Sequence, residues 1–310
     1  MNNKSTQPVF TPSTFASPDP SAVLSSATES AFARTSARTL VAIPVYNEEM
    51  YVERVLSRVL SAHPNVLVID DGSSDRTASL LSSFAVDGIR HAKNAGYGQS
   101  LNDAFAYAMA RDYEWIITID CDEQHEPAAI PAFIERASRG DADIISGSRY
   151  LLPPSGDSAP ADRRAINASV TAELNQRLST RLGTTLTDSF CGFKAHRVSS
   201  LRSLRITDKG YAFPMQLWVQ AAAYGLRVCE LPVKLIYNDT TRTFGGLLDD
   251  AQVRLKHYRS VMHQQIRQLS HLLPNKASHG LIDAVVSSGG VVTPSISRPN
   301  VMCRCEIPGA

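Results

Sequence analysis

The sequence contains no apolar run long enough to span a bilayer, and it contains few cysteines. No stretch of about 18 or more apolar residues occurs in the 310 residues, so we expect no transmembrane helix. The five cysteines are odd in number and form no Cys-x-x-Cys pair, which argues against a zinc site and against a disulfide framework. The N-terminus also lacks the pattern of a secretory signal. These absences predict a cytoplasmic protein.

An excess of charge of one sign is missing as well. The chain has 31 Lys plus Arg and 30 Asp plus Glu, a net charge of +1, which argues against a globally basic nucleic-acid binder. The charges are nevertheless divided unevenly, because residues 39–150 carry 9 basic and 17 acidic side chains, whereas residues 151–275 carry 16 and 9. We expect the first region to hold cations, and the second to hold anions or to lie on an anionic surface.

The two ends of the chain differ in composition from its middle. Residues 1–38 are rich in Ser, Thr, Pro and Ala, and residues 274–310 are similar, so both have little apolar surface to offset the entropy of ordering. We therefore predict a disordered arm over residues 1–38 and a disordered tail over residues 274–310. Between them we expect a catalytic domain over residues 39–246 and an amphipathic helix over residues 247–273.

Short apolar runs alternate with helical patterns in the middle of the chain. This alternation predicts an α/β fold with a mostly parallel, doubly wound sheet flanked by helices. In such sheets ligands bind beyond the carboxyl ends of the strands. The predicted strands are Thr39–Val45, Val66–Ile69, Ile89–His91, Trp115–Ile119 and Ile144–Ser146.

The segment after the predicted strand at 115–119 contains a possible metal site. If this segment is extended, Asp120, Asp122 and Gln124 share one face, whereas Cys121 points into the sheet. Carboxylate and amide oxygens are ligands that suit Mg²⁺ or Mn²⁺. Alternatively, Asp-x-Asp simply ends a strand with polar residues, and three residues alone do not decide between the two interpretations.

Polar segments also follow three other predicted strands. One aspartate of Asp70-Asp71-Gly72 could accept hydrogen bonds from a nucleobase or ribose, although Asp and Gly also form ordinary turns. The segment Asn94–Gly98 is glycine-rich but does not match the dinucleotide pattern GxGxxG. At the end of the first strand, Pro44 and Tyr46 could pack against a nucleobase, and Glu48 could reach the ribose. Alternatively, these residues simply form a strand end and a helix cap.

Taken together, these four segments resemble the family 2 glycosyltransferases. Four later segments narrow the resemblance to the dolichol-phosphate mannosyltransferase and polyprenyl-phosphate glycosyltransferase group, and the likeness spans roughly residues 39–262. It implies the GT-A fold, a nucleotide diphosphate sugar donor such as GDP-mannose or a UDP-hexose, a divalent metal, and inversion at the sugar. The later segments are Gly147–Tyr150, Asp188–Lys194, Lys209–Gln216 and Arg242–Gly246.

The resemblance also implies roles for single residues. Metal and diphosphate would be held at Asp120, Asp122 and Gln124. The acceptor phosphate would be held at Arg149 and Arg163, although Asn167 of the same region stands where some relatives have Ser. Arg242 would contact the donor, although it aligns with a one-residue shift against the Lys of some members. The implied donor contacts are Pro44, Tyr46, Glu48, Asp70, Asp71, Asp120 and Arg242.

The acceptor decides whether the reaction needs a base. A polyprenyl phosphate has a second pKa of about 6, so it is already a nucleophilic dianion at neutral pH. A hydroxyl acceptor would need a carboxylate base, and Asp188 lies where many relatives with hydroxyl acceptors place theirs. A third interpretation is a nucleotide-sugar-binding protein without turnover, against which the intact Asp120, Asp122 and Gln124 argue.

The helix predicted within residues 247–273 carries one apolar stripe. It could lie on an anionic membrane surface, which would make the protein peripheral on the inner face of the membrane. Equally, the stripe could dock on the core or form a seam for self-association. The stripe consists of Ala251, Leu255, Tyr258, Met262, Ile266, Leu269 and Leu273.

Overall fold

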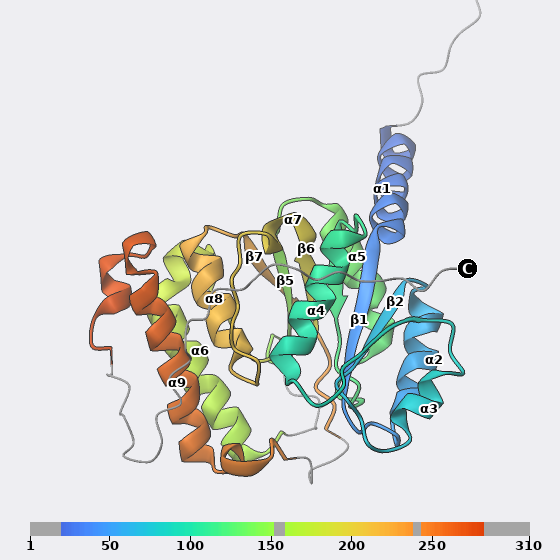
Figure 1. Ribbon diagram of the computed structural model, residues 1–310. Coiled ribbons are helices and arrows are strands. Elements are labelled where there is room, and N and C mark those ends of the chain that lie inside the picture. The colour runs from blue at the N-terminus through green and yellow to red at the C-terminus, as the bar shows by residue number, and fades with distance from the viewer. Residues whose placement is uncertain (1–19, 152–158, 238–242, 282–310) are drawn as a thin grey trace, which may run out of the picture.

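The computed structural model describes residues 20–151, 159–237 and 243–281, which form a seven-stranded sheet with helices on both faces (Figure 1). The strand order is β3-β2-β1-β4-β6-β5-β7; β6 runs antiparallel to β4 and β5, and the other neighbours are parallel. The predicted mostly parallel α/β sheet is therefore confirmed. The strands are β1 (Thr39–Val45), β2 (Val66–Asp70), β3 (Asp87–Arg90), β4 (Trp115–Thr118), β5 (Ile144–Ser148), β6 (Lys194–Arg197) and β7 (Val228–Pro232).

The central strands are continuous apolar runs. β1 reads TLVAIPV and β2 reads VLVID, and nearly every residue of both is buried. Such runs suit parallel strands that helices cover on both faces. The parallel register places Val45 of β1 beside Asp70 of β2, so the polar segments that follow these strands meet at one edge of the sheet.

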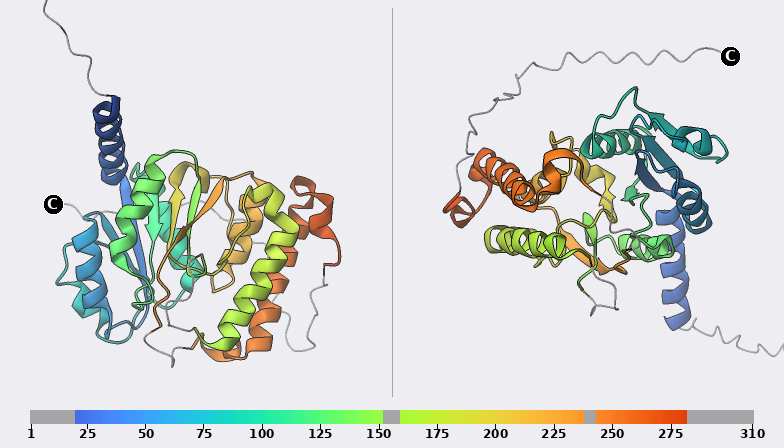
Figure 2. Two further views of the ribbon diagram at one scale, coloured as in Figure 1. Left: turned by 180° about the vertical axis from the view of Figure 1, so that it is seen from behind. Right: turned by 90° about the horizontal axis from the view of Figure 1, so that it is seen from below.

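Helices cover both faces of the sheet (Figures 1 and 2), and an apolar cluster lies on each face. Val41 and Ile43 of β1 face a cluster that includes α2 and α5, whereas Leu40 and Ala42 face a cluster that includes α4, α6, α8 and α9. The helices after β1 are α2 (Val52–Ala62), α3 (Thr77–Leu81), α4 (Tyr97–Ala110), α5 (Ile130–Ser138), α6 (Ala161–Leu182), α7 (Val198–Leu201), α8 (Phe213–Ala223) and α9 (Ala251–Gln268), with short 3₁₀ turns η1 (Pro127–Ala129), η2 (Gly246–Asp249), η3 (Ser270–Leu272) and η4 (Asn275–Ser278).

The expected disorder of both ends is wrong where the structure describes them. Helix α1 (Pro20–Ala37) precedes β1, its Phe32 packs against the sheet cluster, and Thr39 Oγ1 donates a hydrogen bond to the Thr35 carbonyl at 2.7 Å. At the other end Ala277 of η4 is fully buried. A few tertiary contacts therefore order segments whose composition alone argued for disorder. Residues 1–19 and 282–310 lie outside the described residues.

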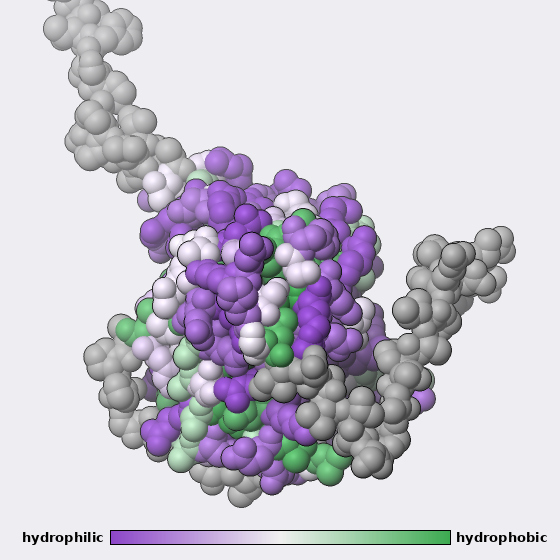
Figure 3. Space-filling model, turned by 90° about the vertical axis from the view of Figure 1, so that its left-hand side faces the viewer, coloured by the Kyte–Doolittle hydropathy of each residue, from purple (hydrophilic) through white to green (hydrophobic). Residues whose placement is uncertain are grey.

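The apolar stripe of α9 faces the interior of the protein. Tyr258, Met262 and Ile266 are buried in the cluster formed with α6 and α8. The structure thus favours the docked helix over a stripe lying on a membrane, which corrects the predicted surface contact through residues 247–273. The side of the molecule shown in Figure 3 is accordingly hydrophilic with small apolar patches. Within the described parts of the chain, no helix is long and apolar enough to cross a membrane.

Candidate functional site

A cavity of about 620 Å³ opens where the carboxyl ends of the strands meet. Residues from all four predicted strand-end segments line it, although residues 70–75 contribute only Asp71. Several residues from later segments line it as well. Asp70 and Asp188 are not among the lining residues, and Arg242 lies outside the part of the chain that the structure describes. The predicted residues that line the cavity are Pro44, Tyr46, Glu48, Asp71, Asp120, Asp122, Gln124, Arg149 and Arg163.

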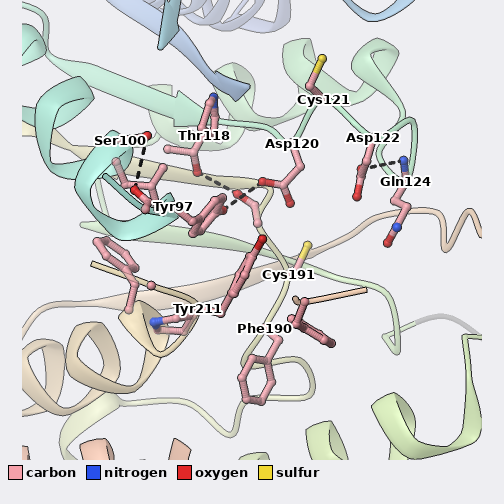
Figure 4. Close-up of a pocket in the computed structure, with 18 of the residues that line it drawn as sticks. Tyr97, Ser100, Thr118, Asp120, Cys121, Asp122, Gln124, Phe190, Cys191 and Tyr211 are labelled. Atoms are coloured by element: carbon pink, nitrogen blue, oxygen red, sulfur yellow. Dashed lines mark hydrogen bonds between the residues drawn. The ribbon is translucent and has the colours of Figure 1, made fainter. Parts of the chain in front are cut away.

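The segment after β4 bends instead of continuing as a strand. Glu123 has a φ of 57°, and Asp122 Oδ1 accepts a hydrogen bond from the Gln124 backbone N–H at 3.0 Å. The predicted alternation of side chains along an extended segment is therefore wrong. The bend nevertheless places Asp122 and Gln124 side by side at the cavity, with Cys121 turned away from them (Figure 4).

Asp120 is turned toward a different set of partners. Its Oδ1 accepts a hydrogen bond from the Tyr97 hydroxyl at 2.9 Å (Figure 4). Its Oδ2 lies 3.3 Å from His125 Nε2. Burial alone would raise the pKa of Asp120, but the hydrogen bonds from His125 and Tyr97 outweigh it and lower the pKa. Asp120 is therefore held as a carboxylate in a fixed orientation.

The donor atoms of this corner fit a magnesium or manganese ion. Asp122 and Gln124 offer oxygen ligands, and Asp120 adds a further carboxylate. Across the described ranges, no group of three or more His, Cys, Asp or Glu side chains could enclose a metal ion. An incomplete oxygen shell is what Mg²⁺ commonly uses, because substrate phosphates and water complete it. The corner thus fits a metal that binds together with a phosphate-bearing ligand.

Gly192 lies directly against the Asp120 carboxylate. A Cβ added at Gly192 would come within 2.1 Å of Asp120 Oδ2, and the Gly192 carbonyl accepts a 2.8 Å hydrogen bond from Thr118 Oγ1. The side chain of Asp120 can keep its position only while residue 192 has no side chain.

Gly192→Ala is therefore expected to displace Asp120 and to lower the rate of the reaction that the family resemblance implies about 10²-fold, the effect that a misplacement of about 1 Å can have. Steady-state kinetics would measure the loss, with circular dichroism to confirm the fold. Gly88→Ala is the matched control, because a Cβ at Gly88 of β3 meets nothing within 4 Å. Equal rates for the two variants would contradict this view of Asp120.

The glycine-rich segment Asn94–Gly98 lies close to the backbone of Lys209. The Gly98 N–H donates to the Lys209 carbonyl at 2.8 Å, and a Cβ at Gly96 would lie 2.2 Å from the same oxygen. This approach stacks Tyr211 on Tyr97, with ring centroids 5.8 Å apart. Sequence analysis noted the glycines but missed Tyr97 and Tyr211, whose contact depends on two segments far apart in the chain.

Asp70, the last residue of β2, and Asp71, which follows it, both have partners within the protein. Asp71 accepts hydrogen bonds from the Ala95 and Gly96 backbone N–H groups at 2.7 and 2.8 Å, so it orients the glycine-rich segment from the cavity wall. Asp70 is buried below the wall, and its Oδ1 accepts from the Ser73 N–H at 2.8 Å. Asp70 is not among the residues that line the cavity, and its contact with the donor stays a prediction.

Arg149, which lines the cavity, forms a buried pair with Asp188. Arg149 Nε and Nη2 donate to the Asp188 carboxylate at 2.7 and 3.0 Å, and Asn167 Nδ2 donates to it at 2.7 Å. Burial alone would raise the pKa of Asp188, but the Arg149 charge and these hydrogen bonds hold it well below its usual range. The predicted catalytic base is thus a fully buried carboxylate away from the cavity wall, poorly suited to take a proton.

Two basic side chains line the cavity near this pair. Arg163 of α6 donates a hydrogen bond to the Tyr237 hydroxyl, and its guanidinium lies 4.8 Å from the centre of the Phe244 ring. Lys194 of β6 is buried and donates to the Cys191 carbonyl, and burial lowers its pKa. Sequence analysis missed Lys194 as a site residue, although it ends a segment that carried the family resemblance.

The chain is similar in sequence to known glycosyltransferases. The chain is 29% identical over 233 residues to the undecaprenyl-phosphate mannosyltransferase of Micrococcus luteus, which covers 71% of this chain and 93% of that protein. It is 32% identical over 211 residues to the polyprenol monophosphomannose synthase of Mycolicibacterium smegmatis, covering 64% and 78%.

A solved structure shares the fold. The glucosyl-3-phosphoglycerate synthase of Mycobacterium tuberculosis, crystallised with Mn²⁺, uridine diphosphate and glucosyl-3-phosphoglycerate, superposes with a TM-score of 0.57 at 17% identity, covering 78% of this chain and 85% of that one. This likeness supports the GT-A fold. The sequence profile of glycosyl transferase family 2 matches residues 40–204, more than half of the chain. The protein is therefore a glycosyltransferase of family 2 and is similar, among its members, to the polyprenyl-phosphate glycosyltransferases.

Proposed function

We propose that the protein transfers a hexose from a nucleotide diphosphate sugar to a polyprenyl phosphate, with inversion at the sugar and with Mg²⁺ or Mn²⁺ as cofactor. One observation carries the proposal: a single cavity joins the oxygen ligands Asp122 and Gln124 to the cations Arg149 and Arg163. A corner suited to a metal diphosphate and an end suited to a second phosphate thus share one space. The names of the relatives with polyprenyl phosphate acceptors support the same assignment.

At the donor end, Pro44, Tyr46 and Glu48 form a wall against which a nucleoside can lie. Asp122 and Gln124 would hold the divalent ion. When bound, the ion neutralises the charge that develops on the departing diphosphate. Asp120, fixed by its hydrogen bond from Tyr97, orients the sugar or the ion without having to move during the reaction.

At the acceptor end, a phosphate dianion needs no base. Arg149 and Arg163 bind and orient it, so that one of its oxygens attacks the anomeric carbon from the face opposite the diphosphate. The new carbon–oxygen bond forms as the old one breaks, and the nucleoside diphosphate leaves, which inverts the anomeric centre. The low pKa of Asp188 favours this acceptor over a hydroxyl that requires a base. A lipid acceptor places the reaction at a membrane surface, where we propose that this chain is peripheral on the cytoplasmic side.

A donor panel tests the proposal. Radiolabelled GDP-mannose, UDP-glucose and UDP-N-acetylglucosamine are incubated with purified protein, with undecaprenyl phosphate or undecaprenol, and with Mn²⁺ or EDTA. We expect a labelled glycolipid from one donor, only with the phosphorylated lipid and only with metal. Equal transfer to undecaprenol would favour a hydroxyl acceptor, and donor binding without any transfer or hydrolysis would indicate a non-catalytic protein.

A further inference from the structure

The imidazole ring of His91 lies between two aspartates behind the wall of the cavity. His91 directly follows β3, and its Nδ1 lies 2.6 Å from Asp71 Oδ1 while its Nε2 lies 2.9 Å from Asp103 Oδ2. Asp71 follows β2 and lines the cavity, and Asp103 belongs to α4. The neighbouring Arg90 is turned to Asp70 instead, with its Nε 3.2 Å from Asp70 Oδ2. One ring therefore joins the segment after β2 to α4.

Both ring nitrogens of His91 must donate a hydrogen in this arrangement. A neutral imidazole has one donor and one acceptor nitrogen, whereas an imidazolium has two donors. Both aspartates already act as acceptors, because the two Asp71 oxygens accept backbone N–H groups and the two Asp103 oxygens accept from Gln99 Nε2 at 3.1 and 3.2 Å. A lone pair on either ring nitrogen would thus face an anion. Burial alone would lower the pKa of His91, but its hydrogen bonds to Asp71 and Asp103 outweigh burial and raise the pKa.

The contact between His91 and Asp71 supports the glycine-rich segment. Asp71 Oδ1 accepts from the Ala95 N–H at 2.7 Å on the same oxygen that faces the ring, and Oδ2 accepts from the Gly96 N–H at 2.8 Å. Gly96 and the following Tyr97 line the cavity. The orientation of the Asp71 carboxylate therefore sets the position of this part of the wall, and the imidazolium fixes that orientation.

The carboxylate that His91 orients lies at the proposed donor end of the cavity. The Asp71 backbone N–H donates to the Val45 carbonyl at 2.9 Å, so Asp71 adjoins the residues at the end of β1 that we propose to contact the nucleoside. We propose that His91, as an imidazolium, is a positioning residue that orients Asp71 and the glycine-rich segment for a nucleoside diphosphate. The inference rests on the proposed function, because it takes this end of the cavity to bind the donor nucleotide. It assigns His91 no contact with the ligand, so its effect should pass through the nitrogen that faces Asp71.

His91→Asn and His91→Gln form a matched pair of variants. Each replaces the ring with an amide, but the shorter Asn side chain places its nitrogen near Nδ1, where it can donate to Asp71. The longer Gln side chain places its nitrogen near Nε2, where it can donate to Asp103. We expect the Kd for UDP or GDP with Mn²⁺, measured by calorimetry at pH 7 for whichever nucleotide binds the unsubstituted protein, to rise roughly tenfold in His91→Gln, the scale of one hydrogen bond to a charged group. In His91→Asn it should stay within about twofold of the original value.

Two further measurements separate positioning from general packing. The backbone amides of Ala95 and Gly96 should exchange with deuterium faster in His91→Gln but not in His91→Asn. Nuclear magnetic resonance of the unsubstituted protein should show a proton on both His91 ring nitrogens at pH 7. Equal losses in the two variants, an unchanged Kd in His91→Gln, or a neutral His91 ring would overturn the proposal. If neither UDP nor GDP binds the unsubstituted protein, the proposed function fails instead, and the amide exchange still decides whether His91 positions the glycine-rich segment.

Discussion

Asp122→Ala is expected to reduce kcat for sugar transfer by about 10²–10³-fold, the loss typical of removing one pre-organised electrostatic group. Asp122 and Gln124, the proposed metal ligands that form what we call the metal corner, lie side by side at the cavity. The Asp122 Oδ1 is oriented by the hydrogen bond that it accepts from the Gln124 backbone N–H. Under the proposed function, the cation would then lose a charged ligand, and the departing diphosphate would lose the ion that neutralises it. Mn²⁺ titration by electron paramagnetic resonance in the presence of the donor should show weaker binding in parallel.

The neighbouring carboxylate offers a matched control. Glu123 points away from the metal corner and pairs with Arg54 Nη2 at 2.9 Å, so Glu123→Gln removes an acidic charge one residue from Asp122 without touching the cavity lining. This variant should retain nearly full activity. Comparable rates in Asp122→Ala and Glu123→Gln, both folded, would remove the metal corner from the mechanism.

The parts of the fold that sequence analysis predicted share one physical basis. β1, β2 and β4 are continuous apolar runs because helices cover the sheet on both faces, and such runs are visible in a single sequence. β6 reads KAHR and is not visible in this way. Lys194 donates a hydrogen bond to the Cys191 carbonyl, and the His196 ring packs edge-on against Phe105 with centroids 5.1 Å apart, so its polar side chains make contacts that depend on distant segments.

The candidate site likewise contains residues that could be predicted from the sequence and residues that could not. Residues that directly follow strands, such as Asp122 and Gln124, could be predicted because parallel strands bring their carboxyl ends to one edge. The partners of those residues could not, since Tyr97 reaches Asp120 from the start of another helix. The motif that contains Asp188 gave no sign of whether its carboxylate is exposed as a base or buried against Arg149, 39 residues away in the chain.

Asp188→Asn is expected to lower the free energy of unfolding by about 3–5 kcal/mol at neutral pH, because it leaves the charge of Arg149 buried without its partner. Asp188 is fully buried and its bidentate partner Arg149 is 14% exposed, so water screens the pair poorly. The pair of Arg136 and Asp141, whose aspartate is 61% exposed, is the control, and Asp141→Asn should lower the stability far less than Asp188→Asn. Urea denaturation at pH 7 would measure both.

The pH dependence distinguishes an ion pair from a shape effect. The folded state holds the pKa of Asp188 below its ordinary value near 4, so the pair stabilises the protein fully above about pH 4 and loses this contribution as the pH falls toward the lower folded pKa. The stability difference between the unsubstituted protein and Asp188→Asn should therefore shrink below about pH 4. A difference that stays constant from pH 7 to pH 3 would mean that Asn167 and the local packing, not the charge of Asp188, make this end of the cavity rigid.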